Sequence, residues 1–333
     1  MSRFSEMGRR LHQGEIAFDF VGRRRLWYRI SVLILLAALA GLGVRGLHLG
    51  IEFQGGTVYT LAKPGLTVSQ AQGAVDGIAG GAGPLVQSTG DGRIRIQMSS
   101  AEEVPAAEFT GALSSRLDVP KDSIDVQMIG PSWGKQISER ALLGLFAFLA
   151  LVTVYLAVAF EWRMAAAALA ALLHDVFITV GLYALVGFEV TPGTVIGFLT
   201  ILGYSLYDTV VVFDGVKDKA KGITRQTRMT FGEAANQALN QTLVRSLNTT
   251  VVALLPVAAL LFVGGGLLGA GSLNDISLAL FLGLATGAYS SICVATPLLA
   301  QLKERQPEMK QLASRVAKQR ARAEAAAAPA LAG

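Results

Sequence analysis

Hydrophobic residues in this chain gather into long runs that alternate with polar stretches. The six runs are Leu33 to Val44 with apolar shoulders, Ala141 to Phe160, Met164 to Phe188, Thr194 to Phe213, Thr242 to Val263 and Ile276 to Leu299. At ~1.5 Å per residue, a helical run of about 20 residues matches the ~30 Å thickness of the bilayer hydrocarbon. The pattern predicts six transmembrane helices, which places both termini on the same side of the membrane.

Between the first and second runs, residues 51–135 have the mixed composition of a soluble domain. Gly90-Asp91-Gly92 is a hairpin signal between two predicted strands. The predicted order β-α-β-β-α-β is that of a ferredoxin-like domain. No nucleophile, base and oxyanion donors are gathered in it, so we expect a binding or coupling module. The expected strands are Thr57 to Ala62, Leu85 to Ser88, Arg93 to Met98 and Ile124 to Ile129, and the expected helices are Val68 to Ala79 and Ala101 to Leu117.

The chain therefore divides into five parts. Three arginines, Arg23 to Arg25, precede the first run, which favours an uncleaved anchor over a cleaved signal peptide, although Ala38-Leu39-Ala40 resembles a cleavage site. The expected parts are a polar arm at 1–29, a first transmembrane helix at 30–50, the ferredoxin-like domain at 51–135, a five-helix transmembrane region at 136–302, and a basic, then Ala-rich tail at 303–333.

Composition and charge agree with an integral membrane protein. Hydrophobic residues make up 52% of the 333 positions and charged residues 16%, with a mean hydropathy of +0.48. Of the 29 Lys and Arg residues, 21 lie in the arm, the turn with Arg163, the 217–245 connection and the tail. This distribution predicts cytoplasmic termini and explains the net charge of +5 without a nucleic-acid partner. The single cysteine excludes a disulfide framework within the chain.

One acidic residue lies well inside an apolar run. A carboxylate at the middle of a membrane helix costs roughly 2.5–3.5 kcal/mol, so Asp208 indicates a proton or ion pathway, with a satisfied structural group as the alternative. Spacings of i, i+4 and i+8 predict one polar stripe on each of two helices. The stripes are Asp175, Thr179 and Tyr183 on the third helix, and Thr200, Tyr204 and Asp208 on the fourth.

Other polar residues could act with these carboxyls. His174 precedes Asp175 and titrates near neutrality, unless it serves helix packing. On the fifth helix Arg245 could reach inward to a carboxylate or outward to the headgroups. Counted from the expected helix ends at ~1.5 Å per residue, Asp175 lies ~16 Å, Asp208 ~12 Å and Arg245 ~5 Å inside. The predicted relay is Asp208, Arg245, Asp175 and His174, supported by Thr200, Tyr204, Thr179, Tyr183, Asn248 and Thr249.

Several motifs resemble the SecF family, the smaller membrane subunit of the bacterial SecDF complex in the resistance-nodulation-division superfamily. Their order and spacing cover nearly the whole chain. They are Phe18-Asp-Phe-Val-Gly22, Gly50-Ile-Glu-Phe-Gln-Gly-Gly-Thr57, Ile129-Gly-Pro-Ser-Trp-Gly134, His174-Asp175-Val176, Gly203-Tyr-Ser-Leu-Tyr-Asp208-Thr-Val-Val-Val-Phe-Asp214 and Gln241-Thr-Leu-Val-Arg245-Ser.

The resemblance implies six helices, a periplasmic ferredoxin-like domain and use of the proton-motive force to assist protein export. The implied partners are a SecD-like subunit, the SecYEG channel, an unfolded client preprotein on the periplasmic side and the lipid bilayer of the bacterial inner membrane, with both termini cytoplasmic. No cofactor is expected beyond the transmembrane gradient of H⁺, with Na⁺ as an alternative coupling ion.

The resemblance also assigns positions. Asp208 and Arg245 match the family's proton-relay residues, and Glu52, Gly55, Gly56 and Thr57 form the opening motif of the domain. The chain departs from the family's pattern at two positions: Glu52 stands where Asp is usual, and Gly215 where an Arg commonly follows Asp214. The second departure removes a charge that could pair with that acid.

Three alternatives stay open. A small-molecule or lipid exporter half of the same superfamily would need an enclosing cleft. An intramembrane aspartyl protease would use Tyr207-Asp208, but the Gly-x-Gly-Asp motif of such enzymes is missing from the next helix, so no enzymatic activity is expected. A purely structural subunit would use the polar stripes only to hold helices together.

Overall fold

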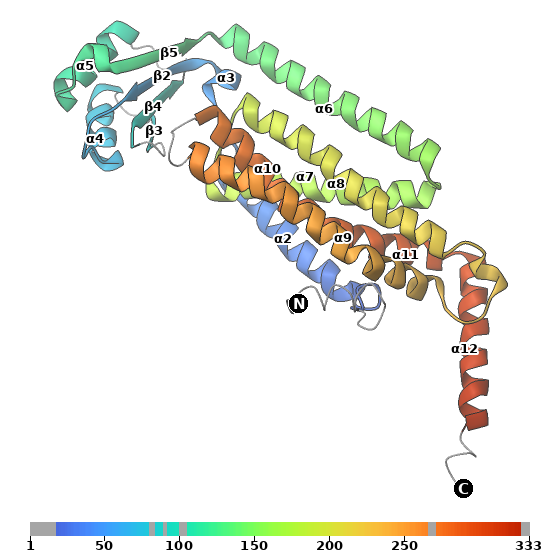
Figure 1. The fold of residues 1–333 in the computed structure, drawn as a ribbon. Helices are drawn as coiled ribbons and strands as arrows, with labels where there is room; N and C mark the ends of the chain where they lie inside the picture. The colour runs from blue at the N-terminus through green and yellow to red at the C-terminus, as the bar shows by residue number, and fades with distance from the viewer. Residues whose placement is uncertain (1–17, 80–83, 89–91, 100–104, 266–270, 328–333) are drawn as a thin grey trace.

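The computed structural model describes residues 18–79, 84–88, 92–99, 105–265 and 271–327. Within these residues, six helices are long and apolar enough to cross a membrane, which confirms the predicted number. Figure 1 shows them as an elongated bundle with the sheet domain at one end and α12 (Pro307–Ala327) beyond the other, here called the domain end and the tail end. The spanning helices are α2 (Arg24–Arg45), α6 (Pro131–Ala159), α7 (Trp162–Val186), α8 (Pro192–Lys219), α9 (Phe231–Ala259), and α10 (Gly271–Ser290) with its continuation.

The sheet domain follows α2. Its elements occur in the predicted β-α-β-β-α-β order, and the sheet is antiparallel with the strand order β3-β4-β2-β5. The predicted hairpin joins β3 and β4, although most of its turn lies outside the described residues. The elements are β2 (Gly56–Leu61), α4 (Val68–Ala79), β3 (Leu85–Ser88), β4 (Ile94–Ser99), α5 (Ala106–Leu117), the short η1 (Lys121–Ser123) and β5 (Ile124–Ile129).

The domain has one small core between the sheet and its two helices. Ile94, Ile96 and Met98 alternate along β4 and are all buried, as the sequence pattern predicted. Tyr59 on β2 packs on Phe109 of α5, with ring centroids 4.7 Å apart. These contacts make the domain a unit with its own apolar core.

The join between domain and bundle contains elements that the sequence analysis missed. The opening motif begins as the single-turn helix α3 (Ile51–Gln54), and a two-stranded parallel sheet pairs β1 (His48–Leu49) with β6 (Glu189–Val190). The motif that ends the domain is the first turn of α6. There, a Cβ added to Gly134 would lie 2.5 Å from the carbonyl oxygen of Phe53, so the start and the end of the domain pack backbone to backbone.

Small residues allow the membrane helices to approach closely. A Cβ added to Gly181 of α7 would lie 2.1 Å from Cβ of Ala38 on α2, and one added to Gly283 of α10 would lie 2.1 Å from the side chain of Ile201 on α8. Such close packing is typical of membrane helices, which associate through van der Waals contacts. It sets the spacing of α7 against α2 and of α8 against α10, and α7 and α8 carry the two buried acids.

Two predicted helix starts were wrong. α6 begins at Pro131, so its first turn lies inside the expected domain 51–135. α9 begins at Phe231, and the expected 217–245 connection is largely helical. Arg245 therefore lies fourteen residues, or ~21 Å, along α9, not one turn from its start. The early turns of both helices are polar and carry no apolar run, which is why the hydropathy pattern placed their starts too late.

The last apolar run is not one regular helix. After α10 the chain forms the π-helical segment η4 (Ser291–Ala295), followed by α11 (Thr296–Glu304). A second π segment, η3 (Leu260–Gly265), ends α9. Single π turns inside α-helices are rare and are frequent at functional sites.

Asparagines on α9 hold the chain that leads into α2. Asn236 Oδ1 accepts hydrogen bonds from the backbone N–H groups of Phe20 (2.8 Å) and Val21 (3.2 Å). Asn240 Oδ1 accepts from the Phe18 N–H at 2.8 Å, and both asparagine amides donate to the Phe18 carbonyl. The first described residues are thus fixed to the tail end of the bundle.

Replacing Asn236 with Ala should destabilise this attachment. The change removes the acceptor of the part-buried Val21 N–H and one of the two acceptors of the Phe20 N–H, at a cost of about 1–3 kcal/mol. We expect a lower unfolding temperature and faster proteolysis near residue 20 in the detergent-solubilised chain. Gln237→Ala, at an exposed neighbouring position, is the control. Equal protease sensitivity of the two variants would contradict the assignment.

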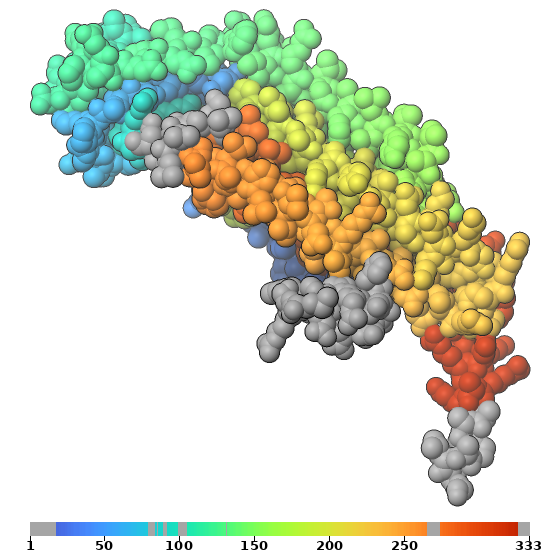
Figure 2. Space-filling view, viewed as in Figure 1, coloured from blue at the N-terminus to red at the C-terminus, as the bar shows by residue number. Residues whose placement is uncertain are grey.

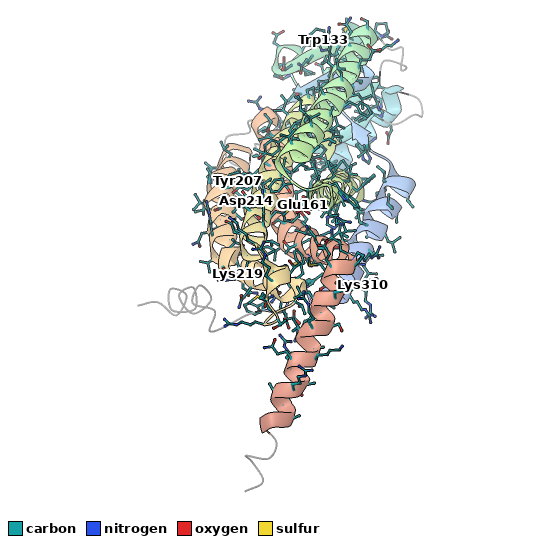
Figure 3. All side chains as sticks on the ribbon, turned by 90° about the vertical axis from the view of Figure 1, so that its right-hand side faces the viewer. Trp133, Glu161, Tyr207, Asp214, Lys219 and Lys310 are labelled. Atoms are coloured by element: carbon teal, nitrogen blue, oxygen red, sulfur yellow. The ribbon has the colours of Figure 1, made fainter. Side chains whose placement is uncertain are left out.

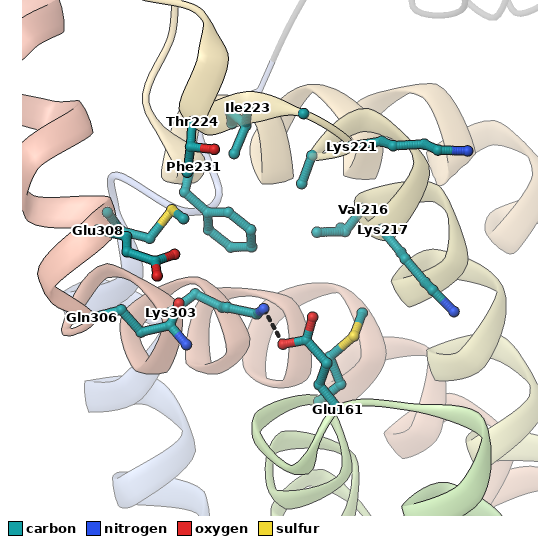
Figure 4. Close-up of a pocket in the computed structure, with 14 residues that line it drawn as sticks. Glu161, Val216, Lys217, Lys221, Ile223, Thr224, Phe231, Lys303, Gln306 and Glu308 are labelled. Atoms are coloured by element: carbon teal, nitrogen blue, oxygen red, sulfur yellow. Dashed lines mark hydrogen bonds and ion pairs between the residues drawn. The ribbon is translucent and has the colours of Figure 1, made fainter.

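The described part of the tail is helical and packs on the bundle. Leu312 and Val316 of α12 are buried against the bundle, and Arg320 forms an ion pair with Glu233 of α9 at 2.8 Å. A cavity of about 420 Å³ lies beside α11, where Lys303 donates to Glu161 in the turn between α6 and α7 (Figure 4). The remaining charged residues of its lining are Lys217, Lys221 and Glu308.

Candidate functional site

Asp175 lies in the middle of α7 and is 1% exposed. Its Oδ2 accepts hydrogen bonds from Ser205 Oγ of α8 at 2.5 Å and from Ser290 Oγ of α10 at 2.7 Å. Its Oδ1 lies 3.2 Å from Nδ1 of the adjacent His174. Asp175 thus bonds two other helices as well as its neighbour.

Asp208 of α8 is 7% exposed. Ser246 Oγ of α9 donates to its Oδ1 at 2.6 Å, and Ser291 Oγ of η4 donates to its Oδ2. Both of these donors are neutral hydroxyls from other segments. The carboxyl therefore links α8, α9 and η4.

The two carboxyls belong to one polar cluster. Their partners Ser290 and Ser291 are consecutive residues, and Ser205 lies one turn before Asp208 on α8. The adjacent serines reach different acids because successive residues lie about 100° apart around a helix. They lie where α10 ends and η4 begins, and Thr296 Oγ1 donates to the Ser291 carbonyl at 3.1 Å. The expectation that both acids share a layer agrees with this arrangement.

The supporting stripe on the fourth helix was partly wrong. Thr200 is exposed and bonds only its own helix, while Tyr204 is half-buried and donates to the Thr249 carbonyl at 2.9 Å. The face of α8 that carries Asp208 instead contains Ser205. On α7, Thr179 and Tyr183 are buried as expected, and Thr179 Oγ1 bonds the Asp175 carbonyl at 2.7 Å. A stripe drawn at i+4 alone drifts around the helix, since 3.6 residues make one turn.

Arg245 does not reach Asp208 in this conformation. Its side chain is exposed, and among the described residues no ion pair joins the two. Asn248 is also exposed, and Thr249 Oγ1 bonds the Arg245 carbonyl at 2.8 Å. The residue of α9 that faces Asp208 is Ser246, which directly follows the arginine.

His174 is buried, and one of its ring nitrogens makes no hydrogen bond. Its Nε2 has no hydrogen-bond partner, and its ring stacks with that of Tyr289 at 6.1 Å between centroids. A cavity of about 250 Å³ between α6, α7 and α8 reaches Asp175 and Thr179, and its other lining is apolar. Asp175 is thus the polar end of an otherwise apolar space.

Asp214 lies apart from this cluster. Tyr207, Asp214 and Lys219 follow one another along α8 (Figure 3), and all three are exposed. Gly215 sits where α8 meets α9, with an added Cβ 3.4 Å from Thr242. The last turns of α8 therefore pack on α9 at Gly215, the position where the SecF-family resemblance led us to expect an arginine.

Sequence reasoning found both acids and missed all four serines that bond them. Serine is common in membrane helices and carries no charge, so a single one gives no signal. The consecutive pair Ser290-Ser291 inside an apolar run, and a serine three residues before Asp208, were the available signals. They are informative only when neighbouring helices are placed.

Comparison with known families decides the relationship. A family model described as "Protein export membrane protein SecD/SecF, C-terminal" matches residues 111–305, and one described as "SecD/SecF GG Motif" matches residues 40–62. The chain belongs to the SecD/SecF family. The first match contains Asp175, Asp208 and their four serine partners, and the second contains Gly55 and Gly56.

Relatives of the SecD/SecF family confirm the resemblance over nearly the whole chain. "Protein translocase subunit SecF" of Streptomyces coelicolor is 58% identical over 322 residues, covering 96% of this chain and 86% of that protein. "Protein translocase subunit SecDF" of Thermus thermophilus is 32% identical over 298 residues, covering 86% of this chain and 39% of that protein. A crystal structure of SecDF, a translocon-associated membrane protein from the same organism, is similar with a TM-score of 0.72 at 29% identity, over 90% of this chain and 42% of that chain.

Proposed function

We propose that this chain is a SecF-type subunit that uses the proton-motive force to assist protein translocation through the SecYEG channel. Family membership supports an export role. The observation that carries the coupling is the pair of buried carboxyls, Asp175 and Asp208, bonded across helices by serine hydroxyls.

Among the residues that the structure describes, no cation pairs with Asp208. Burying an ionised carboxylate without an opposite charge is costly, whereas a neutral carboxyl bonded to hydroxyls is tolerated. We infer that this conformation suits the proton-loaded state of the cluster. Release of the proton leaves a buried negative charge, which favours movement of α8 relative to α9 and η4.

Arg245 can supply the opposite charge in a second conformation. It directly precedes Ser246, so a rotation of α9 by about 100° would exchange the serine for the arginine. Asp208 and Arg245 would then form an ion pair in one state and separate in the other. Asp175 and His174 would extend the same proton path through Ser290 and Ser205.

Movement in the membrane would be passed to the ferredoxin-like domain, which we place in the periplasm with both termini in the cytoplasm. The basic residues of the arm, the 217–245 segment and the tail support this orientation. The described start of the chain and α12 both attach to the first turns of α9, which puts them at one end of the bundle. There the domain would act on an unfolded client preprotein.

A SecD-like partner would complete the membrane pathway. The Thermus SecDF chain is more than twice as long as the segment matched here. Large apolar side chains stand exposed along α6 and α9, and Figure 2 shows one face of the bundle over which α8 and α9 extend. Exposed apolar faces suit contact with lipid and with a second membrane subunit. The inner membrane is the expected location, and H⁺ is proposed over Na⁺.

The alternatives receive less support. The cavity at Asp175 has about 250 Å³, below the range of about 300–1,000 Å³ that is usual for ligand pockets. The larger cavity of about 420 Å³ beside α11 is lined by neither Asp175 nor Asp208. The space that reaches a buried acid is therefore small for the cargo of a small-molecule or lipid exporter. The family description names protein export and no peptidase, which disfavours the aspartyl protease.

The proposal is tested by export into inverted membrane vesicles that contain this chain, a SecD-like partner and the channel. Late-stage translocation of a client should rise several-fold when a pH gradient is imposed, and the increase should need this chain. A Na⁺ gradient of equal size at constant pH should have no effect. Stimulation by Na⁺ alone, or equal stimulation in vesicles that lack the chain, would contradict proton coupling.

A further inference from the structure

A part-buried ion pair joins the sheet domain to the membrane helices. Arg95 of β4 donates from Nη1 to Glu189 Oε2 at 2.8 Å, and Glu189 begins β6 in the connection between α7 and α8. The Glu189 side chain is 8% exposed. With the Gln97 amide turned so that both its atoms are bonded, its nitrogen donates to Glu189 Oε1 at 2.8 Å and its oxygen accepts from the Ile51 N–H. Two side chains of the domain thus hold one carboxyl of the bundle.

Other titratable groups surround this ion pair. A Cβ added to Gly50 would lie 2.3 Å from Glu52 Oε2 and 3.0 Å from Glu189 Oε1, so the two carboxyls approach the same point. Glu52 Oε2 is buried and has no hydrogen-bond partner. Asp275 of α10 adds a third negative charge, and Arg95 is the cation that acts on Glu189. The residue paired with Glu189 in the small sheet, His48, has a buried and unpartnered Nδ1.

In this environment, docking of the sheet domain on the α7–α8 connection depends on protonation of the Glu189 carboxyl. Burial raises the pKa of Glu189 from 4.5 to about 7; Arg95 opposes this rise, and Glu52 and Asp275 add to it. Separation of the domain would expose the carboxyl and return its pKa towards the ordinary value. The docked state therefore binds a proton that the separated state releases at neutral pH. Docking is favoured below the raised pKa, and this contribution is lost as the pH rises through about 7.

We propose that the contact of Arg95 and Gln97 with Glu189 is a pH-dependent latch that holds the sheet domain on the α7–α8 connection. The latch closes when the side of the membrane that carries the domain is acidic, and it opens as that side becomes alkaline. This goes beyond the proposed function, because it involves neither Asp208 nor the serine cluster and stands whether or not they carry protons.

The expected pH dependence of docking is that of a single titrating carboxyl. For a group whose pKa falls from about 7 to about 4.5, the docking equilibrium constant changes about tenfold between pH 6 and pH 8. Glu189→Gln cannot release a proton and should remove this dependence. Glu52→Gln removes a neighbouring negative charge, so it should move the midpoint of opening to lower pH.

The latch is tested by electron paramagnetic resonance distances in the full-length chain in phospholipid nanodiscs. Cys293→Ser removes the native cysteine, and nitroxides are attached at Ser115→Cys on α5 and Val186→Cys at the end of α7, both exposed positions. With the wild-type latch residues, a population with a short distance between the two nitroxides should be present at pH 6, and its fraction should fall at pH 8. Glu108→Gln, an exposed glutamate of α5, is the control and should behave as wild type.

Two results would overturn the latch: distances that are the same at pH 6 and pH 8, or a full pH response in Glu189→Gln. If Glu189→Gln does not fold, the latch is tested by the pH midpoint of opening in Glu52→Gln. A midpoint equal to that of the wild type would show that the pair of carboxyls Glu52 and Glu189 does not control opening. Because no export is measured, failure of the latch is distinguishable from failure of proton-coupled export.

Discussion

Replacing Asp208 with Asn is expected to abolish the gradient-driven part of export and to leave the chain folded. Asn has the same shape, and serine hydroxyls both donate and accept, so Ser246 and Ser291 can bond its amide at a cost of about 1 kcal/mol. The amide cannot gain or lose a proton. The vesicle assay should therefore show the same translocation with and without a pH gradient, while the amount of chain in the membrane is unchanged.

The matched control is Asp214→Asn on the same helix. Asp214 is exposed and bonds none of the four serines, so its loss should leave gradient-driven export within twofold of wild type. A normal gradient response in Asp208→Asn, with both variants present at equal levels, would show that Asp208 only holds helices together.

The acids of the site could be predicted from sequence because a charge in an apolar run has few explanations. Asp175 and Asp208 needed only the hydropathy pattern. Their partners depend on helix rotation: Ser246 rather than Arg245 faces Asp208, and two adjacent residues differ by about 100° around a helix. The π turn at η4 also changes the facing residues, and no local sequence rule indicates it. The serine cluster is therefore a result of tertiary packing.

The fold was predictable where the pattern was periodic. Helix α4 and strands β3 and β5 occur at the predicted residues, because alternation and glycine signals bound them on both sides. The small sheet of β1 and β6 was missed because each strand has two residues and pairs across about 140 positions of sequence. Its residues carry no pattern of their own, and only the closed bundle brings them together.

Replacing Gly56 with Ala should prevent stable docking of β2 in the sheet. Gly56 has φ +151°, a conformation that side chains rarely adopt, and an added Cβ would lie 2.1 Å from the Met98 carbonyl oxygen and 3.2 Å from Ile51. The backbone at Gly56 cannot shift easily to relieve this overlap, because Gly56 pairs with strands on both sides. Strain and overpacking together should cost about 3 kcal/mol or more, which is a large part of the stability of a small domain.

The measurement is limited proteolysis and thermal unfolding of the membrane-inserted chain. Gly56→Ala should expose the domain to protease at temperatures where the wild type is resistant, and it should lower the accumulation of the chain. Gly73→Ala is the control: Gly73 lies within α4 with open space around its Cβ position, so alanine should stabilise the helix by about 0.5–1 kcal/mol. The two glycine-to-alanine changes should thus act in opposite directions within one domain. Wild-type resistance in Gly56→Ala would mean that the backbone at the start of β2 can relax, and that the second glycine of the opening motif is not needed for packing.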